Sequence, residues 1–166
     1  MAKQNIQETM NFSVRDEALY AEFLLLAQPI LASARVPQMA QFIQHGTTNT
    51  LEHVEAVAWQ AFKLARRWHI SCNELALVRG AILHDYYLYD WHEPGHSKLH
   101  GFRHPGLALT NALEDFELSD IEKDLIAHHM WPLTPCPPHH REAWLVCLAD
   151  KMVSTRETIA GRIQQS

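Results

Sequence analysis

The sequence lacks any apolar run that approaches the length of a membrane span. A helix that crosses a bilayer needs about 20 largely apolar residues, and no stretch of the 166 residues comes near this length. The first residues, Met1-Ala2-Lys3-Gln4-Asn5, lead into further polar residues and not into the apolar core of a signal peptide. We therefore expect a cytoplasmic protein without a membrane partner.

Cysteine is scarce as well. The three cysteines are Cys72, Cys136 and Cys147, an odd number without a C-x-x-C spacing. This pattern is not that of a disulfide framework or of a cysteine-based zinc module. It is typical of reduced thiols in a cytosolic protein.

Positive charge is in deficit. The chain has 14 Lys and Arg against 19 Asp and Glu, a net charge of −5 with a sequence pI of about 6.2. This balance argues against a protein that binds nucleic acid through bulk charge. A local site for a small phosphorylated molecule remains compatible with it.

Strand patterns, repeats and low-complexity tracts are also lacking. Most segments instead show helical periodicity, and 47% hydrophobic content in 166 residues is enough for a sizeable core. We predict an all-α fold and a single domain over residues 1–166, with a loop over 88–103 that covers the site. The expected helices are 13–34, 37–45, 49–68, 71–85, 104–116, 119–131 and 140–160.

Histidine, in contrast, is abundant, with 12 residues. His84-Asp85 closes an apolar run, where a polar pair is costly to bury unless something binds it. With 12 His and 7 Asp in 166 positions, random placement gives 12 × 7 / 166, or roughly 0.5 such pairs. The pair therefore gains meaning only from other ligand-type residues.

Those residues are present on other predicted helices. His53 lies on the apolar stripe of helix 49–68, although taken alone it is also compatible with an ordinary core histidine. Asp150 lies in an apolar row of the last helix, and a buried acid usually has a partner. His104 opens helix 104–116. Of His128 and His129, the helical angle favours His129 as the inward residue.

Together these residues predict a metal centre between helices. His53, His84, Asp85 and Asp150 make one four-ligand set, and Asp85, His104 and His129 make a second, with Asp85 as the bridge. Mixed imidazole and carboxylate ligands suit Mn, Fe, Co, Ni or Zn. We expect one or two such divalent ions per chain, and two ions about 4 Å apart are suited to in-line phosphoryl displacement by an activated water.

The order of these residues resembles that of the HD-domain metal-dependent phosphohydrolase superfamily, and most closely its small single-domain bacterial members. The resemblance covers about residues 45–155. It implies an all-α HD-domain helical bundle, metal ligation by the six residues above, and hydrolysis of phosphomonoesters or phosphodiesters, often nucleotides. The stretches that carry it are His84-Asp85-Tyr86-Tyr87-Leu88-Tyr89-Asp90-Trp91-His92, Gly101-Phe102-Arg103-His104-Pro105, His129-Met130-Trp131-Pro132-Leu133-Thr134 and Asp150-Lys151.

One departure from the pattern of the superfamily limits the range of expected substrates. Leu88 stands where many cyclic-dinucleotide phosphodiesterases of this superfamily have a lysine, and no Gly-Tyr-Pro signature is present. We therefore do not expect a cyclic dinucleotide as substrate. Arg103, Lys151 and His128 are close in sequence to the predicted ligands, and we expect them to bind the substrate phosphate. The predicted catalytic residues are Asp85, His128 and Lys151.

Two other functions fit the same residues. The superfamily includes di-iron oxygenases with a similar dinuclear ligand set. A non-catalytic module that binds or senses a metal is the third hypothesis. The sequence predicts an enzyme, a metal-dependent phosphohydrolase, and leaves these two as alternatives.

Overall fold

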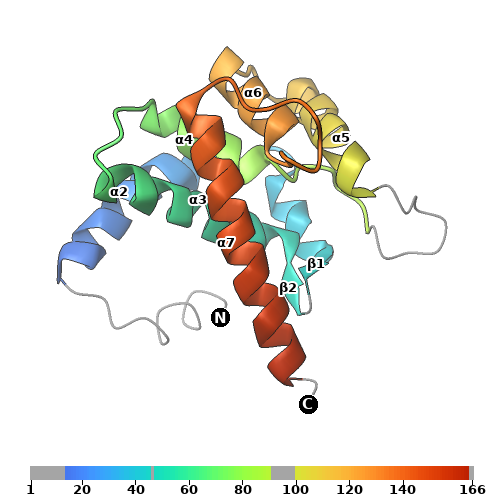
Figure 1. Cartoon of the computed structure of the whole chain (residues 1–166), viewed down its shortest axis with the longest axis horizontal. Coiled ribbons are helices and arrows are strands. Elements are labelled where there is room, and N and C mark those ends of the chain that lie inside the picture. The colour runs from blue at the N-terminus through green and yellow to red at the C-terminus, as the bar shows by residue number, and fades with distance from the viewer. Residues whose placement is uncertain (1–13, 46, 91–99, 165–166) are drawn as a thin grey trace.

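The computed structural model describes residues 14–45, 47–90 and 100–164 and confirms the all-α prediction (Figure 1). Within these residues, no helix combines the length and apolar character needed to cross a membrane. The elements are α2 (Val14–Leu31), η1 (Val36–Gln41), β1 (Ile43–His45), β2 (Thr48–Asn49), α3 (Thr50–Arg67), α4 (Glu74–Leu83), α5 (His100–Asp115), α6 (Asp120–His128) and α7 (Arg141–Gln164).

Helix α3 is the centre of the core. Its apolar side chains recur at helical spacing and are buried, among them Val54, Val57, Ala61 and Phe62. Helices α4 and α7 pack against it, and α7 crosses in front of α3 in Figure 1. These three helices therefore bring three distant parts of the sequence together, and each of them carries or ends at a predicted ligand.

A short hairpin replaces the second half of the helix that we predicted over 37–45. A 3₁₀ helix ends at Gln41, and β1 then pairs antiparallel with β2, with Ile43 opposite Asn49. The β-branched Ile43 and Thr48 favour extended backbone, and strands of three and two residues are too short to show a strand period in the sequence. As a result, Gln44 points inward and is buried.

Helix α5 begins earlier than expected. We predicted a start at His104-Pro105, whereas the helix begins at His100 and contains Pro105. Proline removes one intrahelical hydrogen bond, but here it does so without ending the helix. The predicted loop over 88–103 was therefore too long at its C-terminal end, and its residues 91–99 lie outside the described part of the chain.

Side-chain caps start three of the helices. Asn49 with Glu52 and Ser119 with Glu122 form capping boxes, at the starts of α3 and α6. Ser71-Cys72-Asn73-Glu74 also has the sequence pattern of a capping box, but Asn73 caps α4: its side chain accepts the Ala76 N–H at 3.1 Å. The Asn73 N–H also donates to Glu142 at 2.7 Å, so α7 fixes the start of α4.

This cap gives a simple test of the fold. Asn73→Ala removes the acceptor of the Ala76 N–H, and we expect a loss of about 1 kcal/mol in the free energy of unfolding. Urea denaturation followed by circular dichroism measures it. Ser71→Ala is the matched control, with an expected change within about 0.5 kcal/mol. Equal effects of the two substitutions would contradict the assignment of the cap.

Candidate metal centre

The end of helix α4 presents the His84-Asp85 pair to the interior. The helix is apolar and buried over most of its length, and His84 still has helical backbone angles at its C-cap. The backbone then turns, and the side-chain amide of Asn111 on α5 donates to the carbonyls of Tyr86 at 3.0 Å and Tyr87 at 3.1 Å. The turn that follows Asp85 is thereby fixed to the helix that carries His104.

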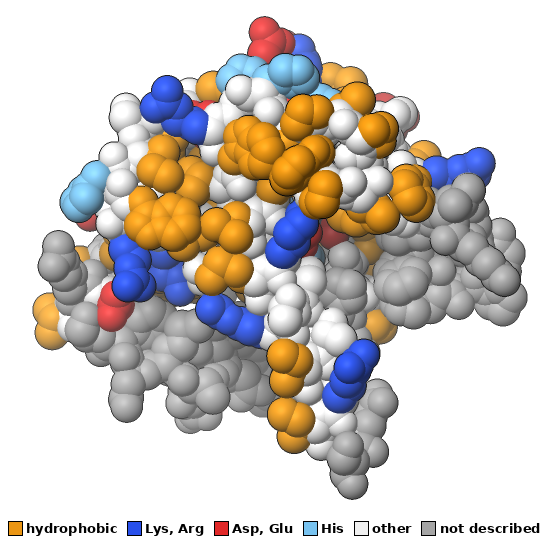
Figure 2. All heavy atoms as spheres, in the orientation of Figure 1, with side chains coloured by type: hydrophobic (Ala, Val, Ile, Leu, Met, Phe, Trp, Pro, Cys, Tyr) orange, Lys and Arg blue, Asp and Glu red, His pale blue; other side chains and the backbone are white. Residues whose placement is uncertain are grey.

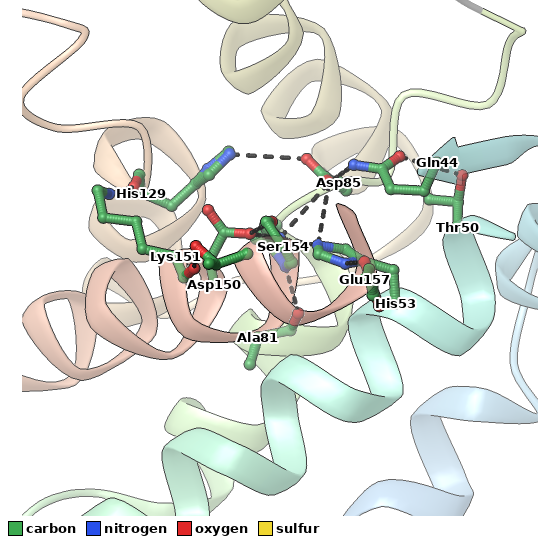
Figure 3. Close-up of polar contacts among 12 residues, drawn as sticks. Gln44, Thr50, His53, Ala81, Asp85, His129, Asp150, Lys151, Ser154 and Glu157 are labelled. Atoms are coloured by element: carbon green, nitrogen blue, oxygen red, sulfur yellow. Dashed lines mark hydrogen bonds and ion pairs between the residues drawn. The ribbon is translucent and has the colours of Figure 1, made fainter. Parts of the chain in front are cut away.

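Asp85 lies between two groups of histidines, and its two carboxylate oxygens face different groups. Oδ2 is 3.8 Å from Nε2 of His53 and 3.5 Å from Nε2 of His84. Oδ1 is 3.1 Å from Nε2 of His104 and 3.6 Å from Nε2 of His129. Figure 3 shows Asp85 between the side chains of His53 and His129. This is the bridging position that the sequence predicted.

Asp150 completes the first group from helix α7. Its Oδ1 is 3.2 Å from Nε2 of His53 and 4.0 Å from Nε2 of His84. The hydroxyl of Ser154, one turn further along the helix, donates to the same oxygen at 3.0 Å and orients the carboxylate. The carboxylate thus faces the first histidine group from the side of the bundle opposite α4.

His104 and His129 form the second group. Their Nε2 atoms are 2.8 Å apart, and both face Oδ1 of Asp85. Two imidazole nitrogens that bind one ion, each at about 2.1 Å, lie roughly 3 Å from each other. The structure therefore brings together all six residues of the two predicted ligand sets.

The outer nitrogens of three imidazoles are held by acceptors. Nδ1 of His84 donates to the Ala81 carbonyl at 2.6 Å, and Nδ1 of His129 donates to the Ile126 carbonyl at 2.9 Å. Nδ1 of His53 is 2.8 Å from a carboxylate oxygen of Glu157. A carbonyl only accepts, so Nδ1 carries a proton in both rings and Nε2 is the nitrogen that faces the centre. Such outer contacts are typical of metal-binding histidines.

Sequence reasoning missed Gln44 and Glu157, which contact the predicted ligands. The Gln44 side-chain amide donates to Oδ2 of Asp85 at 2.6 Å, while its carbonyl oxygen accepts from the hydroxyls of Thr50, at 3.4 Å, and Tyr87. Gln44 lies on a hairpin that periodicity does not reveal. Glu157 is seven residues after Asp150 on the same helix, and this two-turn spacing was the one signal that could have identified it.

The electrostatics of the cluster favour a cation. Burial alone would raise the pKa of Asp85, but the neighbouring imidazoles of His84 and His104 hold it well below the usual value. Burial lowers the pKa of His53, yet the hydrogen bonds with Asp150 and Glu157 raise it by more, to about 10. The acids around His53 therefore favour positive charge at this point of the core.

Burial also keeps His129 neutral. It lowers the pKa of His129 to about 3, with the neighbouring His84 and His104 acting in the same direction. A histidine must be neutral to bind a metal. His129 thus has the protonation state, the tautomer and the direction that a ligand requires, which supports its choice over His128.

A metal fits the donor set of the centre. Among the described residues, Nε2 of His84 is buried without a hydrogen-bond partner and faces the carboxylates of Asp85, at 3.5 Å, and Asp150, at 4.0 Å. A buried polar atom without a partner costs free energy, and a bound ion removes this cost. His53, His84 and Asp150 offer one compact set of ligand atoms, and His84, Asp85 and His129 offer another, each within 4.8 Å. Four imidazoles and two carboxylates suit a divalent transition metal.

The other three predicted residues make contacts elsewhere. Arg103 is exposed on α5, next to His104. Nδ1 of His128 is 2.7 Å from a carboxylate oxygen of Asp124 on the same helix. Lys151 is exposed, and its ammonium group donates to the backbone carbonyls of Cys147 at 3.3 Å and His129 at 3.5 Å. Their roles in phosphate binding and catalysis stay predictions.

Lys151 also borders a surface cavity of about 480 Å³, which contains none of the predicted ligands among its described lining residues. The cavity is lined chiefly by apolar side chains, including Trp68, Trp131 and Trp144, and apolar side chains cover much of this face in Figure 2. Cys147 lines it as well, and its thiol donates to the His129 carbonyl at 2.9 Å. The cavity therefore lies behind the backbone of His129 and away from the ligand atoms.

Comparison with protein-family models, curated proteins and solved structures finds no match to the chain in any of the three. The metal centre is therefore supported by its geometry and electrostatics alone.

The contact between His53 and Glu157 can be tested directly. Glu157→Gln replaces the carboxylate that holds Nδ1 of His53, and we expect metal affinity to fall by about 10- to 100-fold. Competition with a chromogenic chelator measures the affinity. Glu117→Gln, on the exposed segment between α5 and α6, is the matched control and should bind metal like the parent chain. An unchanged affinity of the Glu157 variant would show that this contact does not support the ligand.

Proposed function

We propose that the protein is a metal-dependent phosphohydrolase that cleaves a phosphomonoester or phosphodiester, with nucleotides as the first substrates to test. The observation that carries the proposal is the position of Asp85, whose two oxygens face two separate histidine groups. A carboxylate in this position is suited to bridge two ions. A pair of divalent ions would supply an activated water and neutralise charge on the phosphoryl oxygens.

The residues of the chain would position this chemistry. Asp85 is fixed by Gln44, and Asp150 by Ser154, so neither carboxylate is free to turn away from the histidines. Pre-organised charge of this kind is a large contribution to catalysis in general. Arg103 is exposed and directly precedes His104 in the sequence. We propose that its guanidinium group contacts the substrate phosphate from the solvent side.

Metal analysis and an anaerobic assay test the proposal together. The purified chain is analysed for metal per chain, then reconstituted with Mn, Fe, Co, Ni or Zn and incubated with a panel of phosphomonoesters, phosphodiesters and nucleotides without oxygen. Release of phosphate or of a nucleoside product supports a hydrolase. Turnover that occurs only with iron and consumes O₂ would replace it with the oxygenase alternative. Bound metal without turnover on the panel would favour the non-catalytic module.

A further inference from the structure

A second group of histidines surrounds Asp124 at the junction of α6 and α7. The group, called here the Asp124 cluster, consists of Asp124, His128, His139 and His140. Nδ1 of His128 is 2.7 Å and Nδ1 of His139 is 3.0 Å from Oδ1 of Asp124, and Nδ1 of His140 is 2.9 Å from Oδ2. The cluster shares no residue with the six ligands of the candidate metal centre.

The Asp124 carboxylate receives more nitrogen contacts than it can accept as hydrogen bonds. Besides three imidazole nitrogens, the backbone N–H groups of His139, at 2.9 Å, and His140, at 2.7 Å, donate to Oδ2. A carboxylate has about four lone-pair sites, yet five nitrogens lie within 3.0 Å of it and three of them share one oxygen. The backbone groups have a fixed direction, so the imidazoles are the groups that require a different partner.

The burial pattern of the cluster makes it reachable by an ion from solvent. The Asp124 side chain is only 6% exposed, whereas the side chains of His128, His139 and His140 are 24%, 72% and 39% exposed. The carboxylate of Asp124 is therefore buried, and the three imidazoles around it are open to solvent. Figure 2 shows histidine side chains together at the top of the face, above the start of α7.

We infer that the Asp124 cluster is a second metal site, which binds a divalent transition metal of the zinc type. Oδ1 of Asp124 and one nitrogen each of His128 and His139 lie within 4.8 Å of one another and supply three ligands. A water would complete the coordination. Imidazole nitrogens in the majority select Zn, Ni, Co or Cu over Mg and Ca, which prefer oxygen.

The bound ion would connect two parts of the chain that the proposed active centre needs. It would join the end of α6 to the start of α7 and so fix both ends of the segment 129–138. His128 directly precedes His129, so the ion would also restrain the backbone from which His129 faces Asp85. The site is therefore structural in character. It does not depend on whether the centre at Asp85 hydrolyses phosphoesters.

The number of zinc ions bound per chain tests this inference, measured in a variant in which the candidate metal centre at Asp85 binds metal less tightly. Asp85→Asn removes the bridging carboxylate of the candidate metal centre, and equilibrium dialysis with Zn²⁺ then measures what remains. We expect the triple variant Asp85→Asn, His139→Asn, His140→Asn to bind one zinc per chain fewer than the Asp85→Asn variant. Both histidines are partly or largely exposed, so their loss leaves the core intact.

His69→Asn, at an exposed histidine outside the cluster, is the matched control in the same Asp85→Asn background and should keep the zinc. Co²⁺ provides a second readout, since its absorption spectrum reports nitrogen coordination at the site independently of enzyme activity. Equal zinc binding by the Asp85→Asn chain and the triple variant would overturn the inference. Loss of the zinc in the His69 control as well would overturn it too, because the binding would then not belong to this cluster.

Discussion

Replacing Asp85 with asparagine is expected to lower phosphoester hydrolysis to about a thousandth of the parent rate or less, which corresponds to about 4 kcal/mol of lost transition-state stabilisation. Asparagine has the same shape and still accepts the hydrogen bond from Gln44 with its one carbonyl oxygen. It has no second oxygen with which to face His104 and His129, and it has no negative charge. Metal bound by the two candidate sets should fall together with activity, because Asp85 belongs to both.

Steady-state kinetics and metal analysis of the same preparation measure this effect. Asp120→Asn, at an exposed position at the start of α6, is the matched control, with parent-like metal content and rate. Circular dichroism confirms that the Asp85 variant is folded. If the folded variant kept full activity and its metal, Asp85 would not be the bridge and the proposed mechanism would be wrong.

Removal of metal is expected to cause the second largest effect, on stability. A ligand that binds only the native state at about a thousand times its Kd stabilises that state by about 4 kcal/mol. For a chain of this size, such a gain raises Tm by roughly 10 °C. The ion would offset the cost of burying three polar groups: Nε2 of His84 and the carboxylates of Asp85 and Asp150.

Differential scanning calorimetry of the chelator-treated chain, before and after addition of Mn²⁺, Co²⁺ or Zn²⁺, measures the shift. Ca²⁺ serves as the matched control ion, since it prefers an all-oxygen site and should change Tm little. The His139→Asn, His140→Asn variant isolates the contribution of the six-ligand centre from that of the Asp124 cluster. A Tm that is the same with and without transition metal in this variant would contradict a metal site at Asp85.

The sequence predicted which polar residues meet in the core better than it predicted the residues that hold them. His53, His84 and Asp150 stand out because each is a polar residue in or at the end of an apolar helical stripe, and this anomaly depends only on positions within one helix. The choice of His129 over His128 followed from the same angular argument. It agrees with the structure, in which His129 faces Asp85 and His128 faces Asp124.

Gln44, Glu157 and the Asp124 cluster were not predicted, each for its own physical reason. Gln44 lies on a hairpin whose strands of three and two residues are too short to show a strand period. Glu157 follows Asp150 by two helical turns, but it lies among the polar residues that are usual on α7, so this spacing alone did not single it out. His139 and His140 follow a proline-rich turn, and no local pattern shows that both contact the buried Asp124.

The spread of the ligands along the chain has a consequence for how the protein folds. Residues 53 and 150 are nearly a hundred positions apart in sequence, yet Nε2 of His53 and Oδ1 of Asp150 are 3.2 Å apart. Contacts between distant segments form only after the entropy of closing the intervening loop has been overcome. Helix α7 must therefore dock on α3 before the first ligand set exists, so a nascent chain that has not yet released α7 from the ribosome has no complete centre to load.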